Sequence, residues 1–324
     1  MSRFFKLLFN ELMKIFVRKT TWVMYGILTV IVIAGIILTI TTDQIETEYS
    51  DNWREELKQE NENLAEENAE MKRGSEESGI DFGVTYFEEQ INKNNYYLEN
   101  DIKPLNYGAW QHVLDNAGLV SLISLFTIII GSGIVSSEFR WGTIKLLLIR
   151  PVSRTMILAS KFVAVLLFAL FTLIFLWIVS FISGAIVFGF EGFNPSIVLQ
   201  KAEGLVYVPL VGEVLTEYGY NLVNLVMMTT FAFMISTIFR NSSIAIGLGI
   251  FLMMGGNMVV QIFSEYDWAK FILFANTNLR QYETGNVWID GMTLGFSITM
   301  LIIYFVVFIV LSWVFFNKRD VAGQ

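Results

Sequence analysis

Cysteine is absent from this chain of 324 residues, which also has only one histidine and four prolines. Without cysteine the chain can form neither a disulfide framework nor a thiolate site, and its redox compartment cannot be inferred. His112 has no cysteine or second histidine with which to share a metal ion, so it is more simply an interfacial residue beside Trp110. We therefore expect no metal ion and no cofactor on this chain.

Charge is also scarce, because only 16% of the residues are charged while 54% are hydrophobic. An ordinary soluble domain of this size does not have such a composition, so the chain is predicted to be a membrane protein. Its net charge of -8 is a poor guide to the whole molecule. The acidic residues lie mainly in one segment, about residues 43–107.

Several functional motifs are missing as well. No G-x-x-x-x-G-K-[ST] pattern is present, so the chain has no P-loop to bind nucleotide phosphates. Basic residues do not form a patch interleaved with aromatics, which argues against nucleic-acid binding. The apolar runs lack paired carboxylates, a histidine cluster or a serine with a base, so an intramembrane enzyme is excluded. Any ATP-driven work would need a separate subunit.

Six apolar runs are long enough to cross a hydrocarbon core of ~30 Å, which takes roughly 20 helical residues. They cover residues 22–41, 117–136, 156–188, 219–239, 243–263 and 292–316. The third run is longer than a bilayer needs and should tilt or project, with the ammonium of Lys161 reaching back to the interface. The predicted fold is an all-α membrane protein with six transmembrane helices.

Basic residues near the ends of these runs predict the orientation, because cytoplasmic flanks are enriched in lysine and arginine. Segments 1–21, 137–155 and 317–324 are therefore predicted to be cytoplasmic, with both termini inside a cell membrane. The basic residues concerned are Arg3, Lys6, Lys14, Arg18, Lys19, Arg140, Lys145, Arg150, Arg154, Lys161, Arg240, Lys318 and Arg319.

The first 21 residues have the pattern of an amphipathic helix in contact with membrane lipid. Apolar residues recur at helical spacing, while charged residues occupy much of the rest. The apolar set is Phe4, Leu7, Leu8, Leu12, Ile15 and Phe16. The alternative is a solvated basic tail.

The acidic segment 42–116 is predicted to be an extracellular helical hairpin. Two apolar sets with helical spacing flank Gly74 and Gly79, which would lie in the connection. The sets are Tyr49, Trp53, Leu57, Leu64 and Met71, then Phe87, Ile91, Leu98 and Ile102. Partial disorder is the competing interpretation, because neighbouring glutamates repel and the apolar seam is thin.

Two further segments are predicted on the outer side. Residues 189–218 are expected to be a loop, and residues 264–291, which include Trp268 and Phe271, are expected to form a re-entrant or interfacial segment. Acidic residues in both segments could surround an outer mouth, although a solvated face explains them more simply.

Polar residues within the spans are costly in lipid and usually face protein or a cavity. Asn257 and Gln261 lie one turn apart on one face of the fifth span. The tentative substrate pathway is Ser132, Ser136, Met253, Asn257, Met258 and Gln261. Hydrogen bonding between helices is an equally good interpretation, and Ser132/Ser136 and Ala245/Gly249 have the spacing of close-packing pairs.

The segment between the second and third spans is short, charged and amphipathic. Cations and Glu138 surround an apolar turn, and Pro151 ends any helix just after it. A bare loop would not need an amphipathic helix, so an element outside the membrane is expected to bind it. The pattern E-x-x-x-G-T-(I/L)-K-x-L-L-x-x-P-x-S-R resembles the first cytoplasmic coupling segment of ABC-2 type transporter permeases. The coupling residues would be Glu138, Arg140, Gly142, Thr143, Ile144, Lys145, Leu147, Leu148, Arg150, Pro151 and Arg154.

This resemblance implies a permease subunit of an ATP-driven exporter, similar to bacitracin-resistance and lantibiotic-immunity permeases. Residues 10–19 also look like the N-terminal elbow helix of that family. The chain would pair with itself or a related permease and bind two copies of an ABC ATPase, which would carry the ATP and Mg. Glu138 would pair with a cation of the ATPase or cap a helix, and spans two and five would flank the pathway of an amphipathic peptide, drug or lipid.

A second hypothesis needs no transport. The chain could be a membrane sensor or scaffold whose acidic outer hairpin recognises a ligand and whose cytoplasmic edge reports it. A neighbouring gene for a P-loop ATPase would favour transport, and a neighbouring kinase alone would favour sensing.

Overall fold

The computed structural model describes residues 3–41, 49–78, 84–140, 152–239 and 241–318, and over these it is mostly helical. Six of its helices are long and apolar enough to cross a membrane. They are α2 (Lys19–Thr41), the run Ala109–Glu138, α8 (Arg154–Val187), α9 (Leu210–Phe239), α10 (Ser242–Ile262) and α13 (Leu294–Lys318). The run Ala109–Glu138 combines α5 (Ala109–Asp115), η1 (Asn116–Leu119) and most of α6 (Val120–Arg140).

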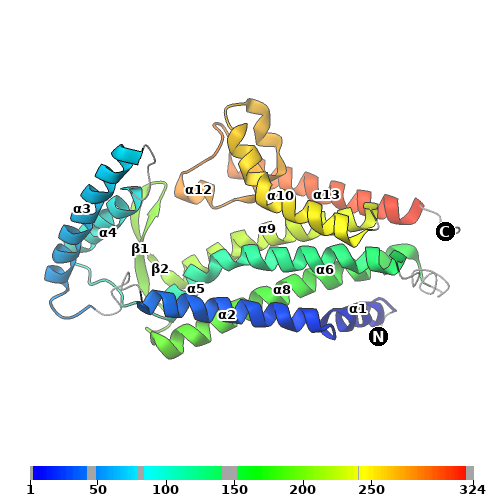
Figure 1. Cartoon of the computed structure of the whole chain (residues 1–324), viewed down its shortest axis with the longest axis horizontal. Helices are drawn as coiled ribbons and strands as arrows, with labels where there is room; N and C mark the ends of the chain where they lie inside the picture. Colours follow the sequence, from blue (N-terminus) through cyan, green and yellow to red (C-terminus); the bar gives the residue numbers. More distant parts are fainter. Residues whose placement is uncertain (1–2, 42–48, 79–83, 141–151, 240, 319–324) are drawn as a thin grey trace.

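These helices form a long bundle with two distinct ends (Figure 1). The described parts nearest both termini lie at one end, together with the end of α6 and the beginning of α8; we call this the terminal end. Helices α3 and α4 lie at the opposite end, which we call the hairpin end.

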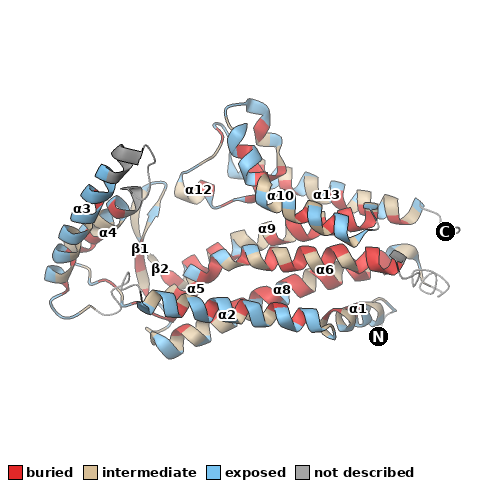
Figure 2. Cartoon of the chain, viewed as in Figure 1, coloured by how far each residue is buried: buried red, intermediate tan, exposed pale blue. Residues whose placement is uncertain are grey.

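The α5–α6 run and α9 form the centre of the bundle (Figure 2). In each of them 61% of the most apolar stretch is buried, compared with 39% or less in the other four spans. The peripheral helices expose large apolar side chains, such as Ile186, Phe251 and Met254. Such faces suit lipid or another protein chain.

At the terminal end, α1 (Arg3–Phe16) packs against α8 and is separated from α2 by a short break. The break leaves carbonyl groups at the end of α1 without helical partners. Side chains of α2 satisfy two of them, because Thr21 Oγ1 donates to Ile15 O at 2.6 Å and Trp22 Nε1 donates to Phe16 O at 2.9 Å. Two other spans that start at this end begin with side-chain caps, Ser153 on α8 and Asn241 on α10.

At the hairpin end, α3 (Trp53–Ser78) and α4 (Val84–Glu99) pack against each other and against a small sheet. Trp53, Leu57, Tyr97 and Val198 form a core where they meet. The backbone N–H of Val198 donates to the hydroxyl of Tyr97 at 2.9 Å, which fixes α4 on the sheet.

The sheet corrects the prediction of an all-α protein with a plain loop at 189–218. Strands β1 (Ser196–Lys201) and β2 (Gly204–Pro209) pair antiparallel, with Val198 opposite Tyr207. Short alternations of β-branched and aromatic residues favour strands when a neighbouring element covers one face. Here α4 and the start of α9 provide that cover.

Two spans are longer than predicted, because acidic or amphipathic residues at their ends were assigned to loops. Helix α9 begins at Leu210 rather than 219, and its early glutamates are paired: Lys201 Nζ lies 2.9 Å from Glu213, and Arg280 Nη1 lies 3.1 Å from Glu217. The second span begins at Ala109 rather than 117. His112 of α5 is buried against α8, facing Gly184.

Residues between α10 and α13 form three short helices, η2 (Asp267–Phe271), α11 (Leu273–Thr277) and α12 (Gln281–Thr284). A buried amide joins this segment to α13, because Asn276 accepts from Ser297 Oγ at 2.7 Å and donates to two carbonyls of its own segment. The hydrogen bonds hold α11 between α10 and α13.

Candidate functional site

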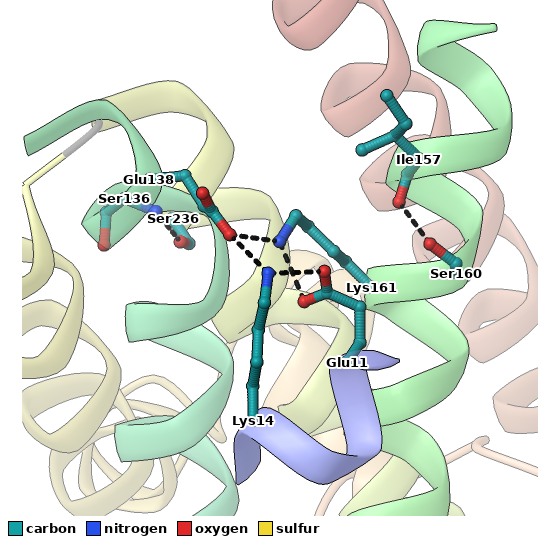
Figure 3. A network of polar contacts seen from close by, with 8 residues as sticks. All are labelled: Glu11, Lys14, Ser136, Glu138, Ile157, Ser160, Lys161 and Ser236. Carbon is teal, nitrogen blue, oxygen red and sulfur yellow. Dashed lines mark hydrogen bonds and ion pairs between the residues drawn. The ribbon is translucent and has the colours of Figure 1, made fainter. Parts of the chain in front are cut away.

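Four charged side chains from three helices form a closed ring at the terminal end of the bundle (Figure 3). Lys161 Nζ of α8 lies 2.8 Å from Glu11 Oε2 of α1 and 3.0 Å from Glu138 Oε1 of α6. Lys14 Nζ of α1 lies 3.0 Å from Glu11 Oε1 and 2.9 Å from Glu138 Oε1. Each carboxylate therefore contacts both ammonium groups, and we call this set the charge cluster.

The charge cluster is largely sealed from solvent by the protein. The side chain of Lys161 is 0% exposed and that of Glu11 is 4% exposed, whereas Lys14 closes the ring from the outside at 38%. Burial by itself lowers the pKa of Lys14, but the carboxylates of Glu11 and Glu138 outweigh it, so the pKa is raised above its usual value. The two positive and two negative charges make the charge cluster neutral as a whole.

This geometry corrects two predictions. Lys161 does not extend its ammonium to an interface, because two buried carboxylates bind it inside the protein. Glu138 is not available to an external cation, since Lys14 and Lys161 already contact it. Both corrections have the same cause: α1 folds against α8 and brings a carboxylate into the bundle.

A hydrogen-bonded serine group lies directly beside the charge cluster. Ser236 Oγ of α9 donates to Ser132 O at 2.7 Å, and Ser136 Oγ lies 2.6 Å from Ser242 Oγ of α10. Ser132 and Ser136 are fully buried. The structure therefore places these two predicted pathway residues in contacts between α6, α9 and α10, where small side chains allow close approach.

The charge cluster lies where the predicted coupling segment leaves and rejoins the bundle. Gly142, Thr143, Ile144, Lys145, Leu147, Leu148, Arg150 and Pro151 lie outside the described residues, as does the side chain of Arg140. At the far side of the segment, Arg154 Nη1 donates to Asn317 O of α13 at 3.1 Å. Trp313 of α13 donates to Thr155 Oγ1 at 3.0 Å. Both ends of the segment are thus attached to other helices.

A polar cavity of about 240 Å³ lies closer to the hairpin end, between α6, α9, α10 and α11. Predicted residues Met253 and Asn257 line it, together with Asn221 and Asn224 of α9. Glu217 and Arg280, which form an ion pair, also line it. Amide groups with both donors and acceptors could bind a polar part of a ligand, while methionines suit an apolar part.

Gln261 and Met258 do not join this cavity wall but lie on the exposed face of α10. Asn257, although it lines the cavity, is also exposed on this face of α10. Exposed amides on an apolar helix are expensive in lipid, so this face requires a protein or water-filled environment.

Sequence reasoning missed Glu11 as a site residue and misjudged Lys161. Two signals were present. Glu11 has the helical spacing of the apolar residues Leu8 and Ile15, and these three are the buried residues of α1. Lys161 is the only charged residue of α8 after Arg154. A charge on an apolar face, or alone in an apolar span, indicates a buried partner.

The described residues contain no group of three or more His, Cys, Asp or Glu side chains that could hold a metal ion. In the charge cluster itself, two ammonium groups and two carboxylates bind one another through ion pairs. It holds α1, α6 and α8 at one point.

Comparison with known proteins shows the family. Residues 82–322 match the model of a family described as a protein of unknown function (DUF2705). The chain belongs to this family. It is 42% identical over 322 residues to a Bacillus subtilis (strain 168) protein named uncharacterized protein YhcI, across 98% of this chain and 99% of that one. It is 36% identical over 203 residues to the uncharacterized membrane protein YdbK of the same organism, across 62% of this chain and 78% of that one.

The DUF2705 match includes Glu138 and Lys161, whereas Glu11 and Lys14 precede it. Six apolar helices and a relative named as a membrane protein together identify this member of the family as a multi-pass membrane protein.

Proposed function

We propose that the chain is the permease subunit of an ATP-driven exporter of the ABC-2 type, located in the cell membrane with both termini in the cytoplasm. Its substrate would be amphipathic, such as a peptide antibiotic, a drug or a lipid. The chain itself would be no enzyme, since its sequence has no P-loop, and two copies of a separate ATPase would hydrolyse the ATP.

The observation that carries the proposal is the position of the charge cluster. A segment resembling an ABC-2 coupling element leaves α6 just after Glu138 and rejoins the bundle at Arg154. Glu138 is bound to α1 and α8, and Arg154 is bound to α13. A push on this segment by an ATPase would therefore reach four helices through short polar contacts, as a mechanical coupling requires.

A route for the substrate follows from the polar cavity lined by Asn221, Asn224, Met253 and Asn257. Next to it, the exposed face of α10 carries Asn257 and Gln261, which need a protein or aqueous neighbour. A second copy or a related permease against α10 would supply that neighbour and would enclose a pathway between two subunits.

The test separates coupling from folding. The chain is first purified from its own cells with mild detergent, and the ATPase that accompanies it is identified by mass spectrometry. Leu147→Glu with Leu148→Glu should abolish co-purification of that ATPase and substrate-stimulated hydrolysis in proteoliposomes, while the melting temperature of the chain stays unchanged. Arg319→Glu in the C-terminal tail is the control, with normal binding and stimulation.

Glu138→Lys would be a poor test, because it places a third ammonium group in a buried cluster and should unfold the terminal end first. If no P-loop ATPase accompanies the chain, or if the double leucine variant retains normal binding and stimulation, the exporter proposal is wrong.

The alternative function is a membrane sensor or scaffold whose acidic hairpin recognises a ligand. Helices α3 and α4 line a cavity together with the sheet, which favours this candidate independently of any transport. Co-purification with a kinase and without an ATPase would favour it over the exporter.

A further inference from the structure

A cavity of about 300 Å³ lies at the hairpin end and is lined by residues of α3, α4, α5 and β1. Its walls are held by hydrogen bonds between elements. Tyr97 of α4 accepts from Val198 N of β1 at 2.9 Å, and Asn94 of α4 donates to Asn61 of α3 at 3.0 Å. The cavity is therefore a built feature of the fold, and its volume is at the lower end of pockets that hold small molecules.

Opposite charges line opposite elements of this cavity. Lys93 projects from α4 and Asp115 from α5. Asp115 accepts a hydrogen bond from the hydroxyl of Tyr107 at 2.6 Å through Oδ2, which leaves Oδ1 for a ligand. Lys93 and Asp115 attract each other, yet within the described part of the chain Lys93 forms no ion pair. Lys93 and one oxygen of Asp115 can therefore each bind a charged group of a ligand.

Burial lowers the pKa of Lys93, and the carboxylates of Asp115 and Glu89 only partly oppose this effect. An anion beside this ammonium would restore the stabilisation that water no longer provides. The surroundings as a whole remain acidic, since Glu60 also lies on the cavity wall and Glu89 lies close by. The site therefore favours a ligand cation more strongly than a ligand anion.

We propose that this cavity binds a zwitterionic α-amino acid, with its carboxylate on Lys93 and its ammonium on Asp115. Tyr97 and Tyr107 also line the cavity, and aromatic rings attract ammonium groups. A simple anion would leave Asp115 without a partner of opposite charge, and a simple cation would leave Lys93 without one. A ligand that carries both charges gives each of these residues a partner of opposite charge. The site does not rest on the exporter proposal.

The first experiment uses the full chain in nanodiscs and measures binding by calorimetry, after a thermal-shift screen of the standard amino acids. The amino acid that stabilises the chain most is then compared with its methyl ester, which lacks the carboxylate, and its N-acetyl form, which lacks the ammonium. The free amino acid should bind most tightly. The N-acetyl form should lose more affinity than the ester, because the site has an excess of acid.

The second experiment assigns the residues. Asp115→Asn, which keeps an acceptor for Tyr107, and Lys93→Gln should each weaken binding of that amino acid by roughly tenfold or more. Lys103→Gln, an exposed lysine in the same part of the chain, is the matched control and should bind normally.

Several outcomes would overturn the proposal. One is that no amino acid stabilises the wild-type chain; another is that the ester and the N-acetyl form bind as tightly as the free amino acid. Binding of phosphoethanolamine without binding of any amino acid would assign the cavity to lipid headgroups instead. Because these comparisons use the wild-type chain, they remain decisive even if a variant fails to fold.

Discussion

At the terminal end of this protein, the packing of helices depends on single residues, and Lys161 is the clearest case. Its side chain has no contact with solvent and is held by carboxylates from α1 and α6. A buried ammonium is tolerated only when its charge is balanced nearby. Lys161, one lysine in an otherwise apolar span, therefore helps to hold α1 against α8.

Replacing Lys161 with methionine should destabilise the protein by about 3 to 5 kcal/mol, because Glu11 and Glu138 would then share only Lys14. Lys58→Met is the control, since Lys58 forms an exposed pair with Glu55 and should cost less than about 1 kcal/mol. Thermal unfolding in detergent measures both. Adding Glu11→Leu to Lys161→Met should recover part of the loss, and equal effects of Lys161→Met and Lys58→Met would contradict the importance of the charge cluster.

Glu191 should make stability depend on pH at the hairpin end. Both of its carboxyl oxygens are shielded and lack hydrogen-bond partners among the described residues, and burial raises its pKa to about 7. A carboxyl with a raised pKa binds its proton more tightly in the folded state. Its contribution to stability is therefore complete below the ordinary value of 4.5 and is lost as the pH rises through about 7.

The variant Glu191→Gln should remove this part of the pH dependence. Melting temperatures are compared between about pH 5 and about pH 8. The wild type should lose stability relative to Glu191→Gln as the pH rises, and Glu203→Gln, at an exposed position of the sheet turn, should behave like the wild type. If the melting temperatures of all three proteins change with pH in parallel, ionisation of Glu191 does not destabilise the folded state.

At the scale of elements, close packing depends on glycines at defined positions. Neighbouring glycines of α10 have opposite surroundings: a Cβ at Gly256 would overlap the ring of Phe274 in α11, whereas a Cβ at Gly255 would meet nothing within 4 Å. Phe274 is buried and belongs to the core formed by α9, α10, α11 and α13. Helix α11 can lie this close to α10 only because residue 256 has no side chain.

Gly256→Ala should therefore destabilise the protein by about 1 to 3 kcal/mol, through overpacking against Phe274. Gly255→Ala should be neutral or should stabilise by up to about 1 kcal/mol, because alanine favours helix more than glycine does. Thermal unfolding of the two variants side by side provides the comparison. A larger loss for Gly255→Ala would show that α11 does not pack on α10 in this way.

For the whole molecule, the described parts of both terminal regions lie at one end and the acidic hairpin at the other (Figure 1). The positive-inside rule predicts that the terminal end is cytoplasmic. Because the chain has no cysteine, single cysteines can report this directly. Glu67→Cys, exposed on α3, should react with an impermeant maleimide in intact cells.

Asn10→Cys and Lys318→Cys, both exposed at the terminal end, should react only after the membrane is permeabilised. Labelling of these two sites in intact cells, without labelling at Glu67→Cys, would reverse the orientation. The exporter proposal would then fail, since its coupling segment could not reach a cytoplasmic ATPase.

The sequence by itself determined the properties that depend on local composition. Six apolar runs predicted six helices able to span a membrane, because backbone groups in hydrocarbon must be satisfied within each helix. The same reasoning failed at the ends of helices. Residues 109–116 and 210–218 look polar or mixed along the sequence, but their glutamates and His112 are buried against partners from other elements.

Only the tertiary structure decided which charges meet. Glu11 and Lys161 are 150 residues apart in the chain, and nothing in their local sequence specifies that they pair. The same holds for β1, which pairs with β2 and packs against α4, and for the cavity lined by Lys93 of α4 and Asp115 of α5. Apolar burial along one helix is a local property, whereas ion pairs and cavities arise between helices, and their geometry exists only after the bundle has packed.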